Sequence, residues 1–422
     1  MDLKAWQAFY RGSNNVFAAE DAAQQALRRR YGWKTASAPL PRPIPPSGPP
    51  TNYFPVAKEP QTPAADVLLA LSRFETNRQL LITASARLES RFWANYDAGF
   101  ACLLPHLARL KGSSQYLSLH ANAALKAGDR ETTLEDVKLL FRLIESIRDE
   151  PIVISQLVRI AMLSDALQPV WEGLAQRQWT EVELSAIGST LGTLDFLADY
   201  HHAVRGERAF NLWGLDYIRK MGIAGLHEMG LERQDSEPPE LKQLLMRVTF
   251  PLIPSGWFDQ DKLYLCRMYE KHLPPLVMLQ ERRVVSHAAI EQANSALVPP
   301  GGSPYYGFSR LLLPSLGGYA EKSARAKSSV DLARVACALE RYRVANGQFP
   351  DTLDALAPKF IAKLPHDVIN GQSLNYRRTD DGQFVLYSVG LNGTDDGGTV
   401  VLTKNGNLDQ NKGDWVWRYP AR

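Results

Sequence analysis

The stretch LERYRVANGQFP at residues 339–350 contains the end of a long helix together with its stop signal. Gly347 follows the last helical residues, and glycine takes the left-handed conformation that a helix C-cap requires. Pro350 then prevents the helix from continuing. Upstream, apolar residues spaced three and four apart predict a helix from about 314 to 345 with one buried stripe, formed by Leu332, Val335, Leu339 and Tyr342.

The residues after this helix read as a small antiparallel sheet. A short helical turn is expected at 352–356, and residues 373–378 and 383–389 alternate as strands around the hairpin signal Asp380-Asp381-Gly382. A further strand is expected at 400–403, and a last strand or an extended tail at 415–419. The C-terminal part of the chain is therefore predicted to be a long helix packed on a small antiparallel sheet.

Two motifs in this part, at 339–350 and LYSVGLNGTDDGG at 386–398, resemble the globular domain of the major pseudopilin of type II secretion systems. In that family a long helix ends in ALxxYxxxNGxYP, and the following sheet carries an LYSxGxxG loop rich in acidic residues. The resemblance covers about residues 310–402. It implies a pseudopilin-like C-terminal module over 305–422 and a location in the cell envelope or periplasm.

The loop that begins at Leu391 is the candidate metal site. Asn392, Thr394, Asp395 and Asp396 offer oxygen ligands, and calcium takes about six to eight oxygens, some of them backbone carbonyls such as that of Leu391. The pseudopilin resemblance implies calcium on the two aspartates, although Asn392 stands where that family usually has aspartate. The alternative is a turn whose side chains hydrogen-bond their own backbone. Both interpretations remain open from the sequence.

Residues 66–297 read as one helix after another and predict a large, irregular α-helical domain. Thr132-x-x-Glu135 and Thr180-x-x-Glu183 match the capping box, which marks helix starts. Residues 117–147 resemble a single tetratricopeptide-like hairpin, with no second copy at a fixed period. The fold class is therefore predicted as α+β, with this helical domain preceding the helix and sheet of the C-terminal module. We expect a protein partner to bind the helical domain.

The N-terminal 65 residues are predicted to be a helix at 18–30 and a proline-rich linker or strap at 38–63. The chain as given shows neither the basic and apolar regions of an export signal nor a run of 18 apolar residues, so we expect no membrane span. Pseudopilins, in contrast, begin with a hydrophobic helix that anchors them in the membrane and packs the filament.

Bulk properties argue against two other classes of protein. A net charge of +3 in 422 residues, without a basic stripe, is too small to indicate nucleic-acid binding. The cysteines Cys102, Cys266 and Cys337 are odd in number and far apart, so neither a disulfide framework nor a zinc knuckle is expected.

No catalytic motif stands out in the sequence. His201 and His202 are adjacent, so they point about 100° apart on a helix rather than onto one face. His227-Glu228 begins like a zincin motif, but Leu231 replaces the second histidine. Two hypotheses follow: a non-enzymatic structural or protein-interaction protein with a calcium-stabilised loop, or a hydrolase-type enzyme with its site around His201 and His202.

Overall fold

The computed structural model describes the chain in separate ranges: 1–12, 54–59, 61–96, 99, 102–228, 250–297, 304–316, 318–404 and 408–419. The predicted helix at 18–30 and most of the predicted proline-rich segment lie outside these ranges. So does most of the predicted boundary between the helical domain and the C-terminal module.

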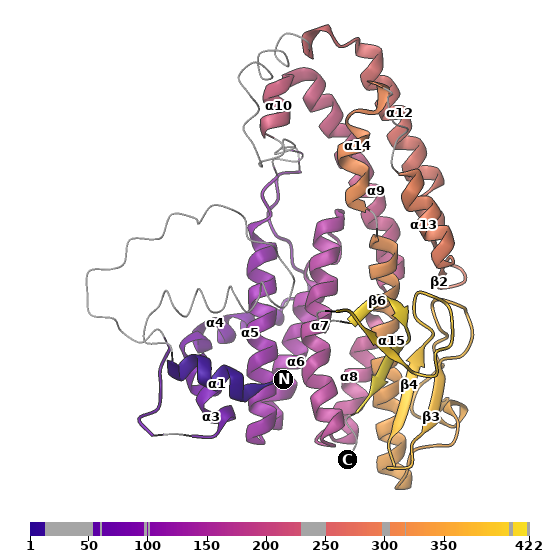
Figure 1. The fold of residues 1–422 in the computed structure, drawn as a ribbon. Coiled ribbons are helices and arrows are strands. Elements are labelled where there is room, and N and C mark those ends of the chain that lie inside the picture. The colour runs from indigo at the N-terminus through magenta and orange to yellow at the C-terminus, as the bar shows by residue number, and fades with distance from the viewer. Residues whose placement is uncertain are drawn as a thin grey trace.

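The described part of residues 1–297 is built mainly of helices (Figure 1). Their bounds are α1 Leu3–Gly12, α3 Pro63–Leu71, α4 Glu75–Ser85, α5 Pro105–Ala127, α6 Arg130–Glu145, α7 Val153–Ala175, α8 Glu181–Thr193, α9 Phe196–Met221, α10 Ile223–Glu228, α12 Ser255–Lys271 and α13 His287–Ala296. Short 3-10 turns lie at Ser72–Phe74, Phe250–Leu252 and Pro274–Leu276. One short ladder joins β1, Val277–Met278, to β2, Arg283–Val284. The predicted α+β fold with a large helical region is confirmed.

The starts of α8 and α6 test the two predicted capping boxes. Thr180 caps α8 as predicted, because its side chain accepts from the Glu183 N–H while Glu183 reaches back to the Thr180 N–H. The capping box predicted at Thr132 and Glu135 is wrong. Asp129 is the cap of α6, and its carboxylate accepts from the N–H of Thr132 at 3.1 Å. Aspartate directly after the Gly128 turn competes successfully with threonine for this position.

The C-terminal part begins with 3-10 turns at Pro304–Tyr306 and Leu313–Leu316 around the short helix α14, Ser309–Leu312. The long helix α15, Tyr319–Asn346, follows, and Gly347 caps it with φ of 81° as predicted. A turn at Leu353–Leu356 then leads to β3 Asn375–Arg378, β4 Phe384–Ser388, β5 Val400–Leu402, β6 Leu408–Gly413 and β7 Trp415–Arg418. Strands β3, β4 and β7 form one antiparallel sheet, and β5 pairs with β6 in a second.

Helix α15 is buried on more than the one predicted stripe. It packs against α7, α8 and α9 on one side and against β4 and β7 on another. Leu332, Val335 and Leu339 are buried as predicted, and Val330, Ala333 and Cys337 are equally buried. Charged residues of the same helix, Lys327, Asp331 and Glu340, are buried as well, so neighbouring elements enclose α15 on several sides. Figure 1 shows α15 between the helical layer and the sheet.

Two large hydrophobic clusters result from this arrangement. The first joins α5, α6, α7 and α8 to α15 and the sheet, through residues that include Leu140, Leu163, Leu184, Leu339 and Leu386. The second joins α9, α12 and α13 to the beginning of α15 and the end of β4, through residues that include Tyr200, Leu265, Ile290, Ala324 and Val389. Both clusters therefore contain residues from each side of the predicted domain boundary.

Candidate functional site

The predicted metal loop joins β4 to β5. Asn392, Thr394, Asp395 and Asp396 are exposed on it, and Leu391 is buried with 2% of its surface exposed. Within the loop, Asn392 Nδ2 donates to Asp396 Oδ2 at 3.0 Å. Asp395 instead accepts from the Tyr387 hydroxyl at 3.0 Å and from the Gly397 N–H at 2.9 Å. The structure thus joins Asn392 to Asp396 and directs Asp395 toward β4.

A third carboxylate at this loop, that of Asp414, was not predicted. Asp414 lies just before β7 with only 4% of its surface exposed. It accepts from the backbone N–H groups of Asp396, Gly398 and Thr399, at 3.3, 2.7 and 3.2 Å. It therefore anchors the loop backbone at residues 396–399 to the start of β7. No sequence motif marked it, because the pairing of β4 with β7 is what brings it to the loop.

The electrostatics of the loop show crowded negative charge. Burial raises the pKa of Asp414, the three N–H groups oppose that shift, and the nearby Asp396 adds to it. Burial also raises the pKa of the Tyr387 hydroxyl to about 12, helped by its hydrogen bond to Asp395. A bound cation would relieve this repulsion.

The donor types at the loop fit calcium better than a transition metal. In the described ranges, no group of three or more His, Cys, Asp or Glu side chains is arranged to hold a metal ion. A site here would combine Asp395 and Asp396 with neutral oxygens from Asn392, Thr394 and the Leu391 carbonyl. Each carboxylate keeps spare lone pairs beyond the hydrogen bonds described. In this form the loop is internally hydrogen-bonded, so calcium stays a prediction.

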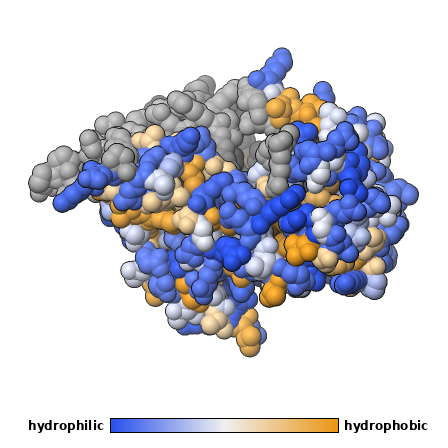
Figure 2. Space-filling view, turned by 90° about the horizontal axis from the view of Figure 1, so that it is seen from below, coloured by the Kyte–Doolittle hydropathy of each residue, from blue (hydrophilic) through white to orange (hydrophobic). Residues whose placement is uncertain are grey.

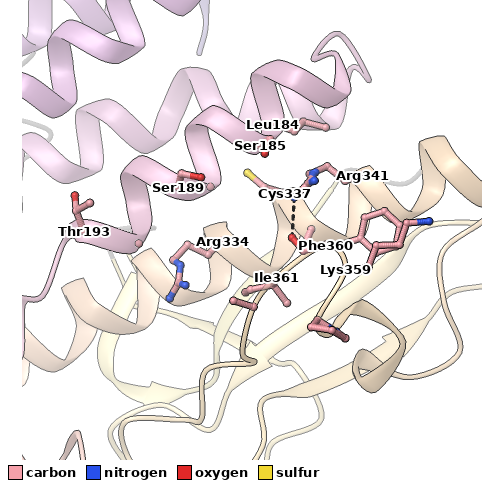
Figure 3. Close-up of a pocket in the computed structure, with 15 residues that line it drawn as sticks. Leu184, Ser185, Ser189, Thr193, Arg334, Cys337, Arg341, Lys359, Phe360 and Ile361 are labelled. Atoms are coloured by element: carbon pink, nitrogen blue, oxygen red, sulfur yellow. Dashed lines mark hydrogen bonds between the residues drawn. The ribbon is translucent and has the colours of Figure 1, made fainter.

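A groove of about 580 Å³ lies between α8, α15 and the segment 358–362 (Figure 3). Small residues of α8 form one wall: Ser185, Gly188, Ser189, Gly192 and Thr193. A Cβ added at Gly188 would come within 3.8 Å of Cys337 Cβ, so the two helices approach closely there. Lys359, Phe360 and Ile361 close the third side.

Three cations line this groove. Arg341 is held by Glu181 at 2.7 Å and by the Phe360 carbonyl at 2.8 Å, and Arg334 lies 3.3 Å from Asp331. Lys359 extends over the Phe360 ring with its Nζ 5.2 Å from the ring centre. The groove therefore combines fixed guanidinium groups with an aromatic ring and an open wall of hydroxyls. The groove could not be predicted from sequence patterns, because residues that meet in it, such as Arg341 and Glu181, are 160 residues apart in the chain.

Cys337, at the bottom of this groove, is not a reactive thiol. It is 1% exposed, and burial raises its pKa to about 12. The thiol therefore stays protonated at neutral pH, while nucleophilic cysteines need the thiolate.

The two histidines of the hydrolase hypothesis contact backbone carbonyls. His201 Nε2 lies 2.9 Å from the Val277 carbonyl oxygen, and His202 Nε2 lies 3.2 Å from that of Asp149. His201 also borders a cavity of about 220 Å³ with Arg205, Arg208 and Glu270. Within the described chain, neither histidine forms an ion pair with a carboxylate, so no acid–base pair is assembled around them.

Comparisons of the chain with protein-family models, with curated proteins and with solved structures find no match. In the described residues, no helix is both long and apolar enough to cross a membrane.

Proposed function

We propose that this chain is a non-enzymatic structural or protein-interaction protein of the cell envelope, related to type II secretion pseudopilins. The groove between α8 and α15 is the observation that carries the interaction role. It is open, it joins the helical domain to the C-terminal module, and it offers cations beside the Phe360 ring. Arginines and aromatic residues dominate the binding energy of many protein interfaces. A partner segment with carboxylates and apolar side chains would complement it.

The face shown in Figure 2 supports a local site rather than a broad apolar interface. On the face shown in Figure 2, hydrophilic residues predominate and apolar ones form small separate groups. Scattered apolar residues are ordinary on soluble surfaces. The hydrolase hypothesis stays a prediction, and the histidines that motivated it contact backbone carbonyls.

Calcium belongs to the same proposal. Asp395 and Asp396, with Asn392, Thr394 and the Leu391 carbonyl, would hold the ion, and the ion would offset the charge gathered around Asp414. The ion would act by stiffening the loop, since the residues around it are hydrogen-bonding and turn-forming groups.

Site-directed photo-crosslinking tests the interaction role. A photoreactive phenylalanine placed at the exposed Ser189 in the groove should give discrete cross-linked products in the cells that make this protein. Charge reversal by Arg334→Glu with Lys359→Glu should abolish them. The same probe at exposed Lys138 on α6 is the control. A product pattern identical at Ser189 and Lys138 would contradict a specific site, and recovery of the native protein only from the cytosolic fraction would contradict the envelope location.

A further inference from the structure

A cavity of about 210 Å³ lies where the β5–β6 hairpin and β7 meet α7 and α15. One face of α15 borders it with three residues at helical spacing, Arg325, Ser329 and Leu332. Most of the rest is apolar, contributed by Leu167, Val400, Val401, Val416 and Trp417. The cavity shares no lining residue with the groove, and Asp414, which accepts from the Asp396 N–H, connects it to the loop at 391–396.

Arg325 has no ion pair and no hydrogen bond among the described residues. Its neighbours on α15 differ: Lys327 bonds Asp331 at 2.6 and 2.7 Å, and Arg334 reaches the same carboxylate. Withdrawing a guanidinium from water without a partner is costly. Burial accordingly lowers the pKa of Arg325. The cavity thus contains a cation whose five donors are unused within the described chain.

Trp415 brings a second unused donor to the same cavity. Its indole Nε1–H is buried and has no hydrogen-bond partner within the described residues. Buried donors of this kind almost always have a partner, so an unpaired donor beside a cavity is a group with which an acceptor in the cavity could bond. The Ser329 hydroxyl adds a donor that can rotate toward the same acceptor.

The acids at the cavity do not supply that acceptor. Asp414 is engaged by three backbone N–H groups, and Asp409 accepts from the N–H of Asn411 at 3.0 Å. They do set the charge that the cavity tolerates. The lining carries two carboxylates, those of Asp409 and Asp414, and two cations, Arg325 and Lys412. Lys412 balances one carboxylate, so a dianion such as phosphate would leave excess negative charge beside the other, whereas Arg325 can balance a single negative charge.

We propose that this cavity binds a small monocarboxylate with an apolar body. The carboxylate accepts from the Arg325 guanidinium, with the Trp415 indole N–H and the Ser329 hydroxyl as further donors. The apolar body lies against the leucine, valine and tryptophan walls. A volume of 210 Å³ equals roughly seven water molecules at about 30 Å³ each, which suits an acid of a similar number of heavy atoms. Such a group can come from a free acid or from the C-terminal residue of a polypeptide.

Titration calorimetry with 4-methylpentanoate tests the proposal on the full chain. Its primary amide, which has the same shape and no charge, should bind about tenfold more weakly or not at all. Arg325→Met should lower the affinity for the acid about tenfold or more, and Trp415→Phe should lower it less. Lys322→Met, which removes an exposed cation of the same helix that lines neither the cavity nor the groove, is the control and should bind like the parent. Tighter binding of an acetylated dipeptide ending in leucine would identify a polypeptide C-terminus as the source.

Three results would overturn the proposal. The first is no binding of either the acid or the dipeptide, and the second is inorganic phosphate binding more tightly than both. The third concerns the ligand-free protein. Arg325→Met should leave the melting temperature unchanged or raise it, because a half-buried charge without a partner among the described residues is removed. A clear fall would mean that Arg325 has a partner within the chain itself.

Discussion

Gly347 and Gly112 both have space for a side chain, but only Gly347 has a left-handed backbone conformation. An added Cβ would meet nothing within 4 Å at either position. Gly347 has φ of 81° as the C-cap of α15, whereas Gly112 lies inside α5. Any side chain at Gly347 therefore suffers left-handed strain, while a side chain at Gly112 only removes chain entropy from the unfolded state.

We expect Gly347→Ala to lower the free energy of unfolding by about 1 kcal/mol. Gly112→Ala should raise it by about 0.5–1 kcal/mol, the usual difference between the two residues inside a helix. Urea unfolding followed by circular dichroism measures both. Equal effects at the two positions would refute the C-cap assignment.

Glu207 is a residue whose burial makes stability depend on pH. It lies on α9, and its carboxylate accepts from the Val153 N–H at 3.0 Å at the start of α7. Burial raises its pKa, and the single N–H only partly opposes the shift. A raised carboxyl pKa means that the folded protein binds the proton more tightly than the unfolded chain. This contribution to stability is complete below the unfolded pKa and is lost as the pH rises through the folded pKa.

Glu207→Gln should therefore stabilise the protein at pH 7, on the order of 1 kcal/mol, since the amide keeps the acceptor without the charge. The advantage should shrink as the pH falls toward about 4, the range in which the unfolded chain also binds the proton. Melting temperatures across this range measure it. Glu89→Gln, at an exposed glutamate, should show no such trend, and a constant advantage at all pH values would disprove the titration of Glu207.

At the scale of elements, one buried charge network ties three helices together. Arg159 of α7 is fully buried. It donates to the Ile144 carbonyl of α6 at 2.9 Å and to Asp199 of α9 at 2.8 Å. Its guanidinium also lies 5.1 Å from the centre of the Phe196 ring. The relative positions of α6, α7 and α9 thus depend on one satisfied cation.

Asp199→Ala should cost about 3 kcal/mol of unfolding free energy, the lower end for a broken buried pair, because Arg159 would keep only the partly exposed Glu145 carboxylate, 3.1 Å away, as a counter-charge. The double variant Arg159→Met/Asp199→Leu should cost less than Asp199→Ala alone, since no charge is left uncompensated. Urea unfolding of these variants measures the difference. A double variant less stable than the single one would show that packing, rather than charge, dominates at this site.

The helices and strands were largely readable from the sequence, and their contacts were not. The stripe through Leu339 predicted only one buried face of α15, because the other buried faces mix small residues such as Ala333 with charged ones such as Lys327 and Asp331, which interrupt the apolar pattern. The metal loop was readable because its residues are contiguous. Asp414 and the groove were not, because strand pairing and helix packing bring those residues together from distant parts of the chain.

At the scale of the whole molecule, calcium binding would act through the loop on a module that shares its core with the helices. The unfolded loop cannot hold the oxygen ligands together, so the ion should bind only the folded protein. Binding stabilises the folded state by about 2.7 kcal/mol when the ion is in hundredfold excess over Kd.

Calorimetry in millimolar calcium should therefore show a higher melting temperature than in chelator. Magnesium should substitute poorly, because it requires tight octahedral geometry and keeps its waters. Asp395→Ala with Asp396→Ala should abolish the response, and Asp380→Ala, at an exposed aspartate of the β3–β4 turn, should keep it. Identical melting in calcium and chelator would reject the site in favour of a self-satisfied turn.

The enclosure of α15 also bears on how this protein can change over evolutionary time. Its small residues, such as Ala333, Ala336 and Ala338, are set by two neighbouring layers at once. A larger side chain that improved the fit to the sheet would shift the helix against α7 and α8. Drift in this helix should therefore require paired changes in both layers. The exposed residues of α8 pack against one layer only, so they can be substituted without a paired change elsewhere, and such substitutions could change the partner that binds there.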